Sequence, residues 1–221
     1  MLRFKYHPAR DAAVALGAIL LFAFLALIAS TGPPPAVDLA WRAAVHSYAH
    51  PWITRVMWFA SWMGSGWVLW PGGVLLACLL DRAGRRNDAL LFALAVVGAN
   101  LLNEEMKLLF HRVRPQPWFD YPLPPTFSFP SGHALVSCCF FLCLAEVLVR
   151  DEWPLALKVF TWTAAAACAL LIGLSRVYLG VHYPTDVLAG YAAAFVWTTV
   201  IRVGHHAWKG RRDRRESREQ G

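Results

Sequence analysis

Long runs of apolar residues, separated by short polar segments, extend over nearly the whole sequence. Each run has about the 20 residues that a helix needs to cross the hydrocarbon core of a bilayer. We expect six membrane helices, over residues 12–30, 57–80, 88–109, 132–149, 158–177 and 184–203. The predicted fold class is therefore all-α. It is a polytopic membrane helical bundle of about six transmembrane helices, formed by one integral membrane domain over residues 1–221.

The first two blocks each allow a second interpretation. Block 12–30 has the position of a signal peptide, but it is longer than a typical signal core. No A-x-A-like cleavage site precedes Thr31, so we favour a retained span. Block 57–80 is interrupted by glycine and proline, which membrane helices tolerate where neighbours satisfy the backbone. Its first turns, residues 57–62, either cross the bilayer or lie in its interface.

The distribution of positive charge predicts the orientation. Of the 21 Lys and Arg residues, 15 lie in the N-terminus, the 81–87 and 150–158 loops and the C-terminal tail, and six lie in the opposite connections. Cytoplasmic loops carry the excess of Lys and Arg. Both termini are therefore expected in the cytoplasm, and segment 31–56, with a short interfacial helix, outside. We expect an integral protein of a cell membrane, such as a bacterial inner membrane. Any functional site in the outer connections would then face the periplasm.

Composition supports a membrane protein: 57% of the residues are hydrophobic and 16% charged, against roughly 25% charged in ordinary globular domains. The net charge is +7, and seven of the 21 Lys and Arg residues lie between Arg202 and Arg218, mostly in the tail of residues 204–221. This cytoplasmic tail is either simply solvated or attracted to anionic lipid headgroups. No basic patch lies on a soluble module, which argues against nucleic-acid binding. The five cysteines lie in apolar blocks without metal-ligand spacing, so we expect buried thiols without disulfides.

Three clusters of unusual polar residues fall at the predicted outer span ends. The first includes Lys107 and Arg114. They are seven residues apart, which is two helical turns, so we expect them to share a helix face. Taken alone, such residues are usually basic side chains that reach from a span end to the interface.

The second cluster, Pro130-Ser131-Gly132-His133, precedes the fourth apolar block. Ser131 is placed to cap the helix, and the backbone N–H groups that follow can bind phosphate oxygens. A plain turn with an N-cap would explain Ser131 equally well. A cationic His133 in the first turn, however, would oppose the helix dipole, so it is harder to explain by capping alone.

The third cluster lies between the fifth and sixth blocks and includes Arg176, His182 and Asp186. His182 and Asp186 are four residues apart, so the carboxylate can hold one imidazole nitrogen and leave the other free to attack. Asp186 would also simply complement the helix N-terminus. Because all three clusters end spans on one side, we expect them to form a single site with three cations, two histidines and one carboxylate.

With these residues the sequence resembles the type 2 phosphatidic acid phosphatase superfamily, which also includes vanadium haloperoxidases and glucose-6-phosphatases. The family patterns are K-x6-RP, PSGH and SR-x5-H-x3-D. They are met by Lys107, Arg114 and Pro115, by Pro130 to His133, and by Ser175, Arg176, His182 and Asp186. Every fixed position matches within a motif core of about 107–186. The resemblance implies a membrane hydrolase that removes phosphate from a lipid phosphate at the outer face.

The resemblance also implies the roles of the residues. His182 would attack phosphorus to form a phosphohistidine, Asp186 would orient it, and His133 would protonate the leaving alcohol and then activate water. The implied phosphate-binding residues are Lys107, Arg114, Ser131, Gly132 and Arg176. Glu104 and Ser175 are expected to support them, Glu104 because it lies three residues before Lys107 on the same helix face. No cofactor and no metal are expected, since three cations are present and no acidic metal cluster is seen.

Several functions stay open. Phosphatidic acid, phosphatidylglycerol phosphate, undecaprenyl pyrophosphate and lipid A phosphates all fit as substrates, and the sequence carries no signal for an oligomeric state. A vanadate-dependent haloperoxidase would use the same cations, but relatives of that kind are generally soluble. A non-catalytic lipid-binding or transport protein is suggested by the intramembrane residues Asn103, Glu104 and Glu105. These lie about one turn from Lys107, however, and the nucleophile and the acid are both intact.

Overall fold

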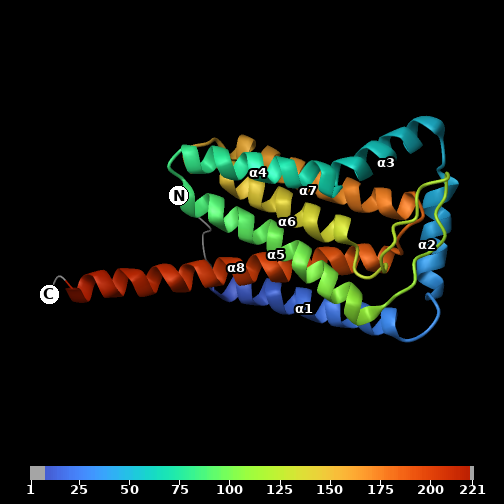
Figure 1. Ribbon diagram of the computed structural model, residues 1–221, viewed down its shortest axis with the longest axis horizontal. Helices are drawn as coiled ribbons and strands as arrows, with labels where there is room; N and C mark the ends of the chain where they lie inside the picture. The colour runs from blue at the N-terminus through green and yellow to red at the C-terminus, as the bar shows by residue number, and fades with distance from the viewer. Residues whose placement is uncertain (1–7, 220–221) are drawn as a thin grey trace.

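The computed structural model describes residues 8–219, and the side chains of residues 8–208. The described residues form eight helices and no strand, as the all-α prediction requires. The helices are α1 (Pro8–Ser30), α2 (Ala36–Ser47), α3 (Pro51–Met63), α4 (Gly66–Arg82), α5 (Arg86–Phe110), α6 (Gly132–Leu148), α7 (Leu155–Tyr178) and α8 (Pro184–Glu219). Figure 1 shows α1 and α4 to α8 running lengthwise side by side, while α2 crosses one end of the bundle.

Helix α6 lies in the middle of the bundle and packs against α5, α7 and α8. Its sequence is apolar or small on nearly every face, which is typical of a helix enclosed by others. Leu135, Cys139 and Phe140 are all buried and belong to the main core cluster. In Figure 1, α6 ends short of α7 and α8 at the end crossed by α2, so the residues at its N-terminus are set back into the bundle.

Six continuous spans are found only in part. Four helices are long and apolar enough to cross a membrane: Pro8–Ser30, Arg86–Phe110, Leu155–Tyr178 and the Pro184–Trp208 part of α8. The bent pair α3–α4 passes the same test only when its two helices are taken together, so the described residues hold four or five candidate spans. Helix α6 has 17 residues and a length of about 26 Å at 1.5 Å per residue. It is shorter than the roughly 30 Å of a bilayer core.

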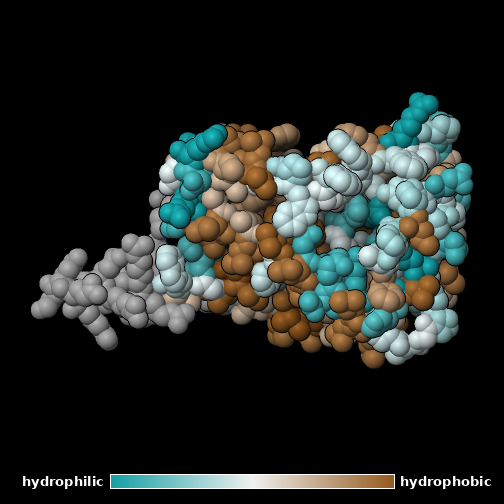
Figure 2. Space-filling view, in the orientation of Figure 1, coloured by the Kyte–Doolittle hydropathy of each residue, from teal (hydrophilic) through white to brown (hydrophobic). Residues whose placement is uncertain are grey.

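The predicted helix 57–80 is not continuous. It is broken after Met63, and α3 and α4 are bent by 48° to each other. The break lies at Gly64 and Ser65, whereas Pro71 lies within α4. Residues 57–62 belong to α3, where Phe59 and Trp62 are exposed, which suits an interfacial position. Figure 2 shows hydrophobic side chains gathered over the middle of the visible face and hydrophilic ones towards its two ends.

The expected helix in segment 31–56 is present, but the prediction for the cysteines holds only in part. Segment 31–56 contains α2, the helix expected there, together with the first turns of α3. Three cysteines are buried, but Cys78 and Cys168 are exposed on α4 and α7, so the prediction of burial is wrong for these two. All five are free thiols. The basic residues Arg3 and Lys5, and the side chains of the tail beyond Trp208, lie outside the described residues.

Candidate active site

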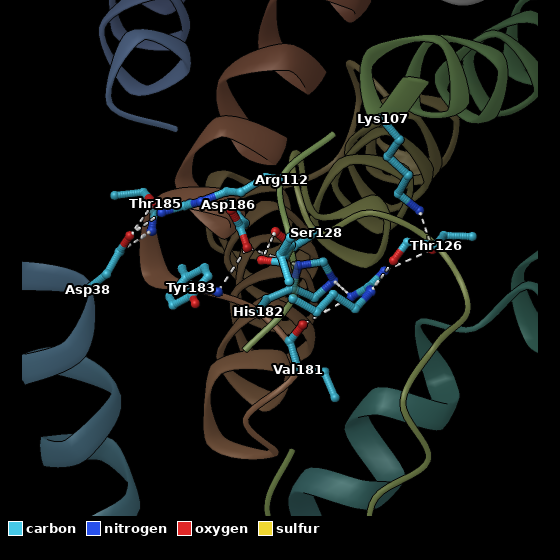
Figure 3. A network of polar contacts seen from close by, with 12 residues as sticks. Asp38, Lys107, Arg112, Thr126, Ser128, Val181, His182, Tyr183, Thr185 and Asp186 are labelled. Carbon is cyan, nitrogen blue, oxygen red and sulfur yellow. Dashed lines mark hydrogen bonds and ion pairs between the residues drawn. The ribbon is translucent and has the colours of Figure 1, made fainter. Parts of the chain in front are cut away.

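Three chain segments meet at the end of the bundle that α2 crosses (Figure 1). They are the 111–131 loop after α5, the N-terminus of α6 and the turn between α7 and α8. Figure 3 shows the polar network there, with His182 and Asp186 beside Arg112, and Lys107 pointing towards Thr126. Lys107 of the first motif and His182 and Asp186 of the third therefore lie at the same end of the bundle, as their positions at span ends predict.

Lys107 and Arg114 meet at Thr126 and not on a shared helix face. Helix α5 ends before His111, which has a left-handed φ of 48°, and Pro115 disfavours helical backbone at the residue before it. Lys107 Nζ lies 3.3 Å from Thr126 Oγ1. Arg114 donates from Nε to the Thr126 carbonyl at 2.6 Å and from Nη2 to its hydroxyl at 3.0 Å. The predicted shared face is wrong, because the loop and not the helix brings Arg114 to the site.

The side chain of His182 is held at both ring nitrogens. Arg114 Nη1 lies 2.9 Å from Nε2, and Nδ1 lies 3.3 Å from Asp186 Oδ2. Because an arginine can only donate, Nε2 accepts and the ring proton resides on Nδ1, which donates it to Asp186. The same carboxylate oxygen accepts the Tyr183 N–H at 2.9 Å. The His182–Asp186 spacing predicts the contact at Nδ1. Nε2 was expected to be free, whereas in the structure its lone pair accepts from Arg114.

Electrostatics keep that ring neutral. Burial, and after it the positive charges of Arg114, Arg176 and Lys107, lower the pKa of His182 well below its ordinary value of 6.5. Burial and the charge of Arg176 also lower the pKa of Arg114, to about 10, which leaves Arg114 charged at neutral pH. A neutral imidazole beside a cationic cluster is suited to attack an anionic phosphoryl group.

His133 borders a cavity of about 150 Å³ between α4, α5 and α6. Its lining is mixed, with Lys107 and Asn103 among the polar residues and Leu69 and Val136 among the apolar ones. At about 30 Å³ per water molecule, it has room for a small alcohol group or a few waters. A leaving group and an attacking water could therefore both be reached from His133.

Ser131 and Gly132 begin α6 next to these groups. Ser131 holds the N-cap position, but its hydroxyl makes no capping hydrogen bond, so the predicted side-chain cap is wrong. The hydroxyl is buried without a partner among the described residues, while the Ser131 N–H donates to the Asp186 carbonyl at 2.9 Å. A Cβ on Gly132 would lie 2.9–3.1 Å from the amide of Asn103, so glycine allows α5 and α6 to approach closely here.

Arg176 is the most deeply buried of the three cations, with 1% of its surface exposed. It donates to the Ser61 hydroxyl and, at 2.8 Å, to the Tyr121 hydroxyl. Within the described part of the chain it forms no ion pair, and its Nε has no hydrogen-bond partner. Buried positive charge without a matching carboxylate is costly unless an anion binds. The site is therefore prepared for an anionic group.

The two expected supporting residues differ. Glu104 Oε1 lies 3.5 Å from Lys107 Nζ and accepts from Asn103 Nδ2 at 2.9 Å, although Glu104 is 59% exposed. Its support of Lys107 stays a prediction. The Ser175 hydroxyl donates to the Ile172 carbonyl inside its own helix at 2.5 Å, and the structure does not bring it to the other site residues.

Several residues of the site lie at no fixed position of the family motifs and were not predicted as site residues from the sequence. They are Asp38, Ser61, Arg112, Tyr121, Thr126 and Thr185, which contact the motif residues directly or through one neighbour. One sequence signal was available: Asp38 is the only acidic residue in the whole segment 31–56. An acid in that otherwise apolar and basic stretch suggests a specific partner.

Comparison with known proteins adds to this geometry. Residues 88–209 match the model of the PAP2 superfamily, and that range holds all three motifs. The chain is 34% identical to phosphatidylglycerophosphatase B of Bacillus subtilis (strain 168) over 187 residues, which cover 83% of this chain and 90% of the relative. It is 31% identical to undecaprenyl-diphosphatase of Sulfolobus acidocaldarius over 147 residues, which cover 63% of this chain and 64% of that protein.

The fold comparison agrees. The structure is similar to the crystal structure of the transmembrane PAP2 type phosphatidylglycerolphosphate phosphatase from Bacillus subtilis, with a TM-score of 0.79 and 30% sequence identity. The similarity covers 87% of this chain and 96% of that one.

Proposed function

This chain belongs to the PAP2 superfamily, and we propose that it removes phosphate from a membrane lipid through a phosphohistidine on His182. It is a membrane-embedded phosphatase of that family. One observation supports the mechanism above the others. The unprotonated Nε2 of His182 faces a cluster of cations, while Nδ1 donates to Asp186.

In the first step, Arg114 Nη1 transfers its hydrogen bond from His182 Nε2 to a phosphoryl oxygen. The freed lone pair of Nε2 attacks phosphorus, and the bond from phosphorus to the lipid oxygen breaks. Lys107, Arg114 and Arg176 bind the phosphoryl oxygens and neutralise their charge, which is the main requirement in phosphoryl transfer. The leaving oxygen takes a proton from His133. The negative charge of the bound phosphate favours the protonated His133 that this step needs.

In the second step, His133 takes a proton from water, and the resulting hydroxide attacks phosphorus. The bond from phosphorus to Nε2 breaks, and inorganic phosphate leaves. The His182 ring carries positive charge while it is phosphorylated, and the carboxylate of Asp186 stabilises that charge through Nδ1–H. A two-step path of this kind replaces one difficult displacement with two easier ones.

The substrate is proposed to be a lipid phosphate, with phosphatidylglycerol phosphate as the first candidate. The relative of that activity matches this chain over 90% of its own length. The cavity beside His133 also has apolar lining residues, including Leu69 and Val136, which suits a lipid alcohol as leaving group. Phosphatidic acid, undecaprenyl pyrophosphate and lipid A phosphates are the alternatives that a lipid panel would separate.

Phosphate release by the purified protein from that panel tests the activity, with His182→Ala as the inactive variant and His50→Ala, an exposed histidine, as the matched control. His133→Ala should lose much more activity on a lipid phosphate than on p-nitrophenyl phosphate. A lipid alkoxide needs the proton, and general acid catalysis is typically worth about 10²–10⁴-fold. A phosphoenzyme trapped by acid quench in His182→Ala would refute the nucleophile.

We propose further that the site faces the outside of the cell membrane, with both termini in the cytoplasm, because most basic residues lie in the opposite connections. Asp120 and Arg82 are both exposed and lie on opposite sides in this topology. A cysteine at Asp120 should react with an impermeant thiol reagent in intact cells. Labelling at Arg82 in its place would reverse the orientation.

A further inference from the structure

Helix α2 crosses the end of the bundle and lies outside the 88–209 range of the family match (Figure 1). Its first turn contains Asp38, which is 0% exposed. Asp38 Oδ1 accepts the Thr185 N–H at 3.0 Å, and Oδ2 accepts the Thr185 hydroxyl at 2.7 Å. The carboxylate thus binds the first turn of α8, where negative charge is favoured by the helix dipole. That turn also carries Asp186.

A second path joins the same two carboxylates. Arg112 Nη2 donates to Asp38 Oδ2 at 2.8 Å, and its Nη1 donates to Asp186 Oδ1 at 2.5 Å and to the Thr185 hydroxyl at 2.8 Å. Its guanidinium carbon also lies 4.3 Å from the centre of the Tyr183 ring. Figure 3 shows this chain of contacts running from Asp38 through Arg112 to Asp186.

A third contact fastens α2 to the other flank of the site. Arg42 donates to the Gln116 carbonyl at 2.8 Å and to the Gly180 carbonyl at 3.1 Å, and it lies 4.4 Å from the centre of the Trp118 ring. Gly180 is two residues before His182. Helix α2 is therefore held on both sides of the histidine, and Asp38 has little freedom to move with respect to Asp186.

We propose that Asp38 is a positioning residue for the reaction, acting through Arg112 and the first turn of α8 to hold the Asp186 carboxylate against His182 Nδ1. This inference rests on the proposed roles of His182 and Asp186. Asp38 touches neither the substrate site nor His182, so it acts only through these neighbours.

The geometry explains why Asp38 is needed. Asp186 Oδ1 accepts from Arg112, while Oδ2 accepts from both His182 and the Tyr183 N–H. The hydrogen bond with His182, at 3.3 Å, is already long. Arg112 at present divides its two terminal nitrogens between two carboxylates. Without the charge of Asp38, both would turn to Asp186, since paired parallel hydrogen bonds are the preferred arginine–carboxylate geometry. The carboxylate would then rotate away from the imidazole.

The alternative is that Asp38 only anchors α2, as buried ion pairs often do. The two roles differ in a double-mutant cycle. A positioning residue that works through Asp186 has nothing left to position in Asp186→Asn, whereas a structural anchor weakens both backgrounds equally.

The experiment measures kcat and KM on the best lipid for Asp38→Asn, Asp186→Asn and the double variant, with Asp120→Asn, an exposed aspartate, as matched control. We expect Asp38→Asn to lower kcat about 10- to 100-fold, the range found when a residue that orients a metal-ligating histidine is removed. KM should change less than about twofold, because no phosphate contact is lost. The kcat of the double variant should lie within about twofold of the kcat of Asp186→Asn.

Equal proportional losses in both backgrounds, or no loss of kcat in Asp38→Asn, would overturn the inference while leaving the proposed function intact. If Asp38→Asn does not fold, Arg112→Lys takes its place in the cycle, because lysine keeps the charge but cannot bridge two carboxylates in the same geometry. Wild-type activity in His182→Ala would instead overturn both the function and the inference.

Discussion

Gly64 lies so close to Ile172 and His133 that a side chain there would disturb the site, so its substitution tests how closely the α3–α4 break packs against His133. It ends α3 with ordinary backbone angles, φ −85° and ψ 1°, so conformation alone would allow alanine. A Cβ there would lie 2.3 Å from Ile172 Cγ2 and 3.2 Å from His133 Cδ2. Because Ile172 is 2% exposed, it has no open space to move into. In Gly64→Ala the break between α3 and α4 must therefore move away from α7 and from His133.

The size of the effect follows from these distances. Ordinary van der Waals contact begins at 3.4 Å, so the backbone must move by about 1 Å from Ile172. Overpacking of this kind costs about 1–3 kcal/mol, which corresponds to a fall in Tm of about 2–12 °C for a chain of this length. The same movement disturbs the wall against which His133 rests. Misplacement of a catalytic group by about 1 Å can lower the rate about 100-fold, so we expect kcat to fall about 10- to 100-fold.

The assay is phosphate release in detergent micelles, together with thermal unfolding of the same preparation. Gly72→Ala is the matched control, since its Cβ would be 3.7 Å from the nearest atom of Phe140. Ile172→Leu removes the Cγ2 that Gly64→Ala meets and should restore part of the Tm. A Gly64→Ala protein with unchanged Tm and unchanged kcat would show that the α3–α4 break does not press on the site as described.

Four other changes test the buried histidine and the cations. The pKa of His182 is held well below 6.5, so the unfolded chain binds more protons than the folded one below that pH, and stability is lost as the pH falls through 6.5. Tm should therefore drop more steeply from about pH 7 to about pH 5 in the wild type than in His182→Asn; equal slopes would contradict this. Thr126→Val removes the hydroxyl shared by Lys107 and Arg114 and should lower kcat/KM about 10-fold or more, as hydrogen bonds to charged groups predict. An unchanged kcat/KM would show that Thr126 does not place these cations. Glu104→Gln should change kcat/KM less than about fivefold, because an exposed ion pair contributes about 1 kcal/mol or less; a larger loss would give Glu104 a part in holding the substrate. Turnover should persist in a chelator if Lys107, Arg114 and Arg176 bind the phosphate as proposed; loss of activity that Mg²⁺ restores would refute a metal-free reaction.

Sequence reasoning succeeded where the relevant geometry is local. His182 precedes α8 by two residues and Asp186 lies in its first turn, so a separation of four residues was enough to place them side by side. It failed where helical spacing was extended beyond the end of a helix. The seven-residue spacing of Lys107 and Arg114 assumed a helix that stops at Phe110. The capping preference of Ser131 gave the correct helix start but the wrong partner for its hydroxyl.

Block lengths and motif spacing are properties of neighbouring residues, so the sequence was enough to predict a membrane helical bundle and to locate the motif residues at span ends. The tertiary structure alone decided which distant groups hold the motif residues. Asp38 reaches Arg112 across 74 positions, and Ser61 reaches Arg176 across 115. These contacts depend on how α2 and α3 fold over the end of the bundle, and helical periodicity describes only one helix at a time. The residues that hold the site in place were therefore visible only once the helices were packed.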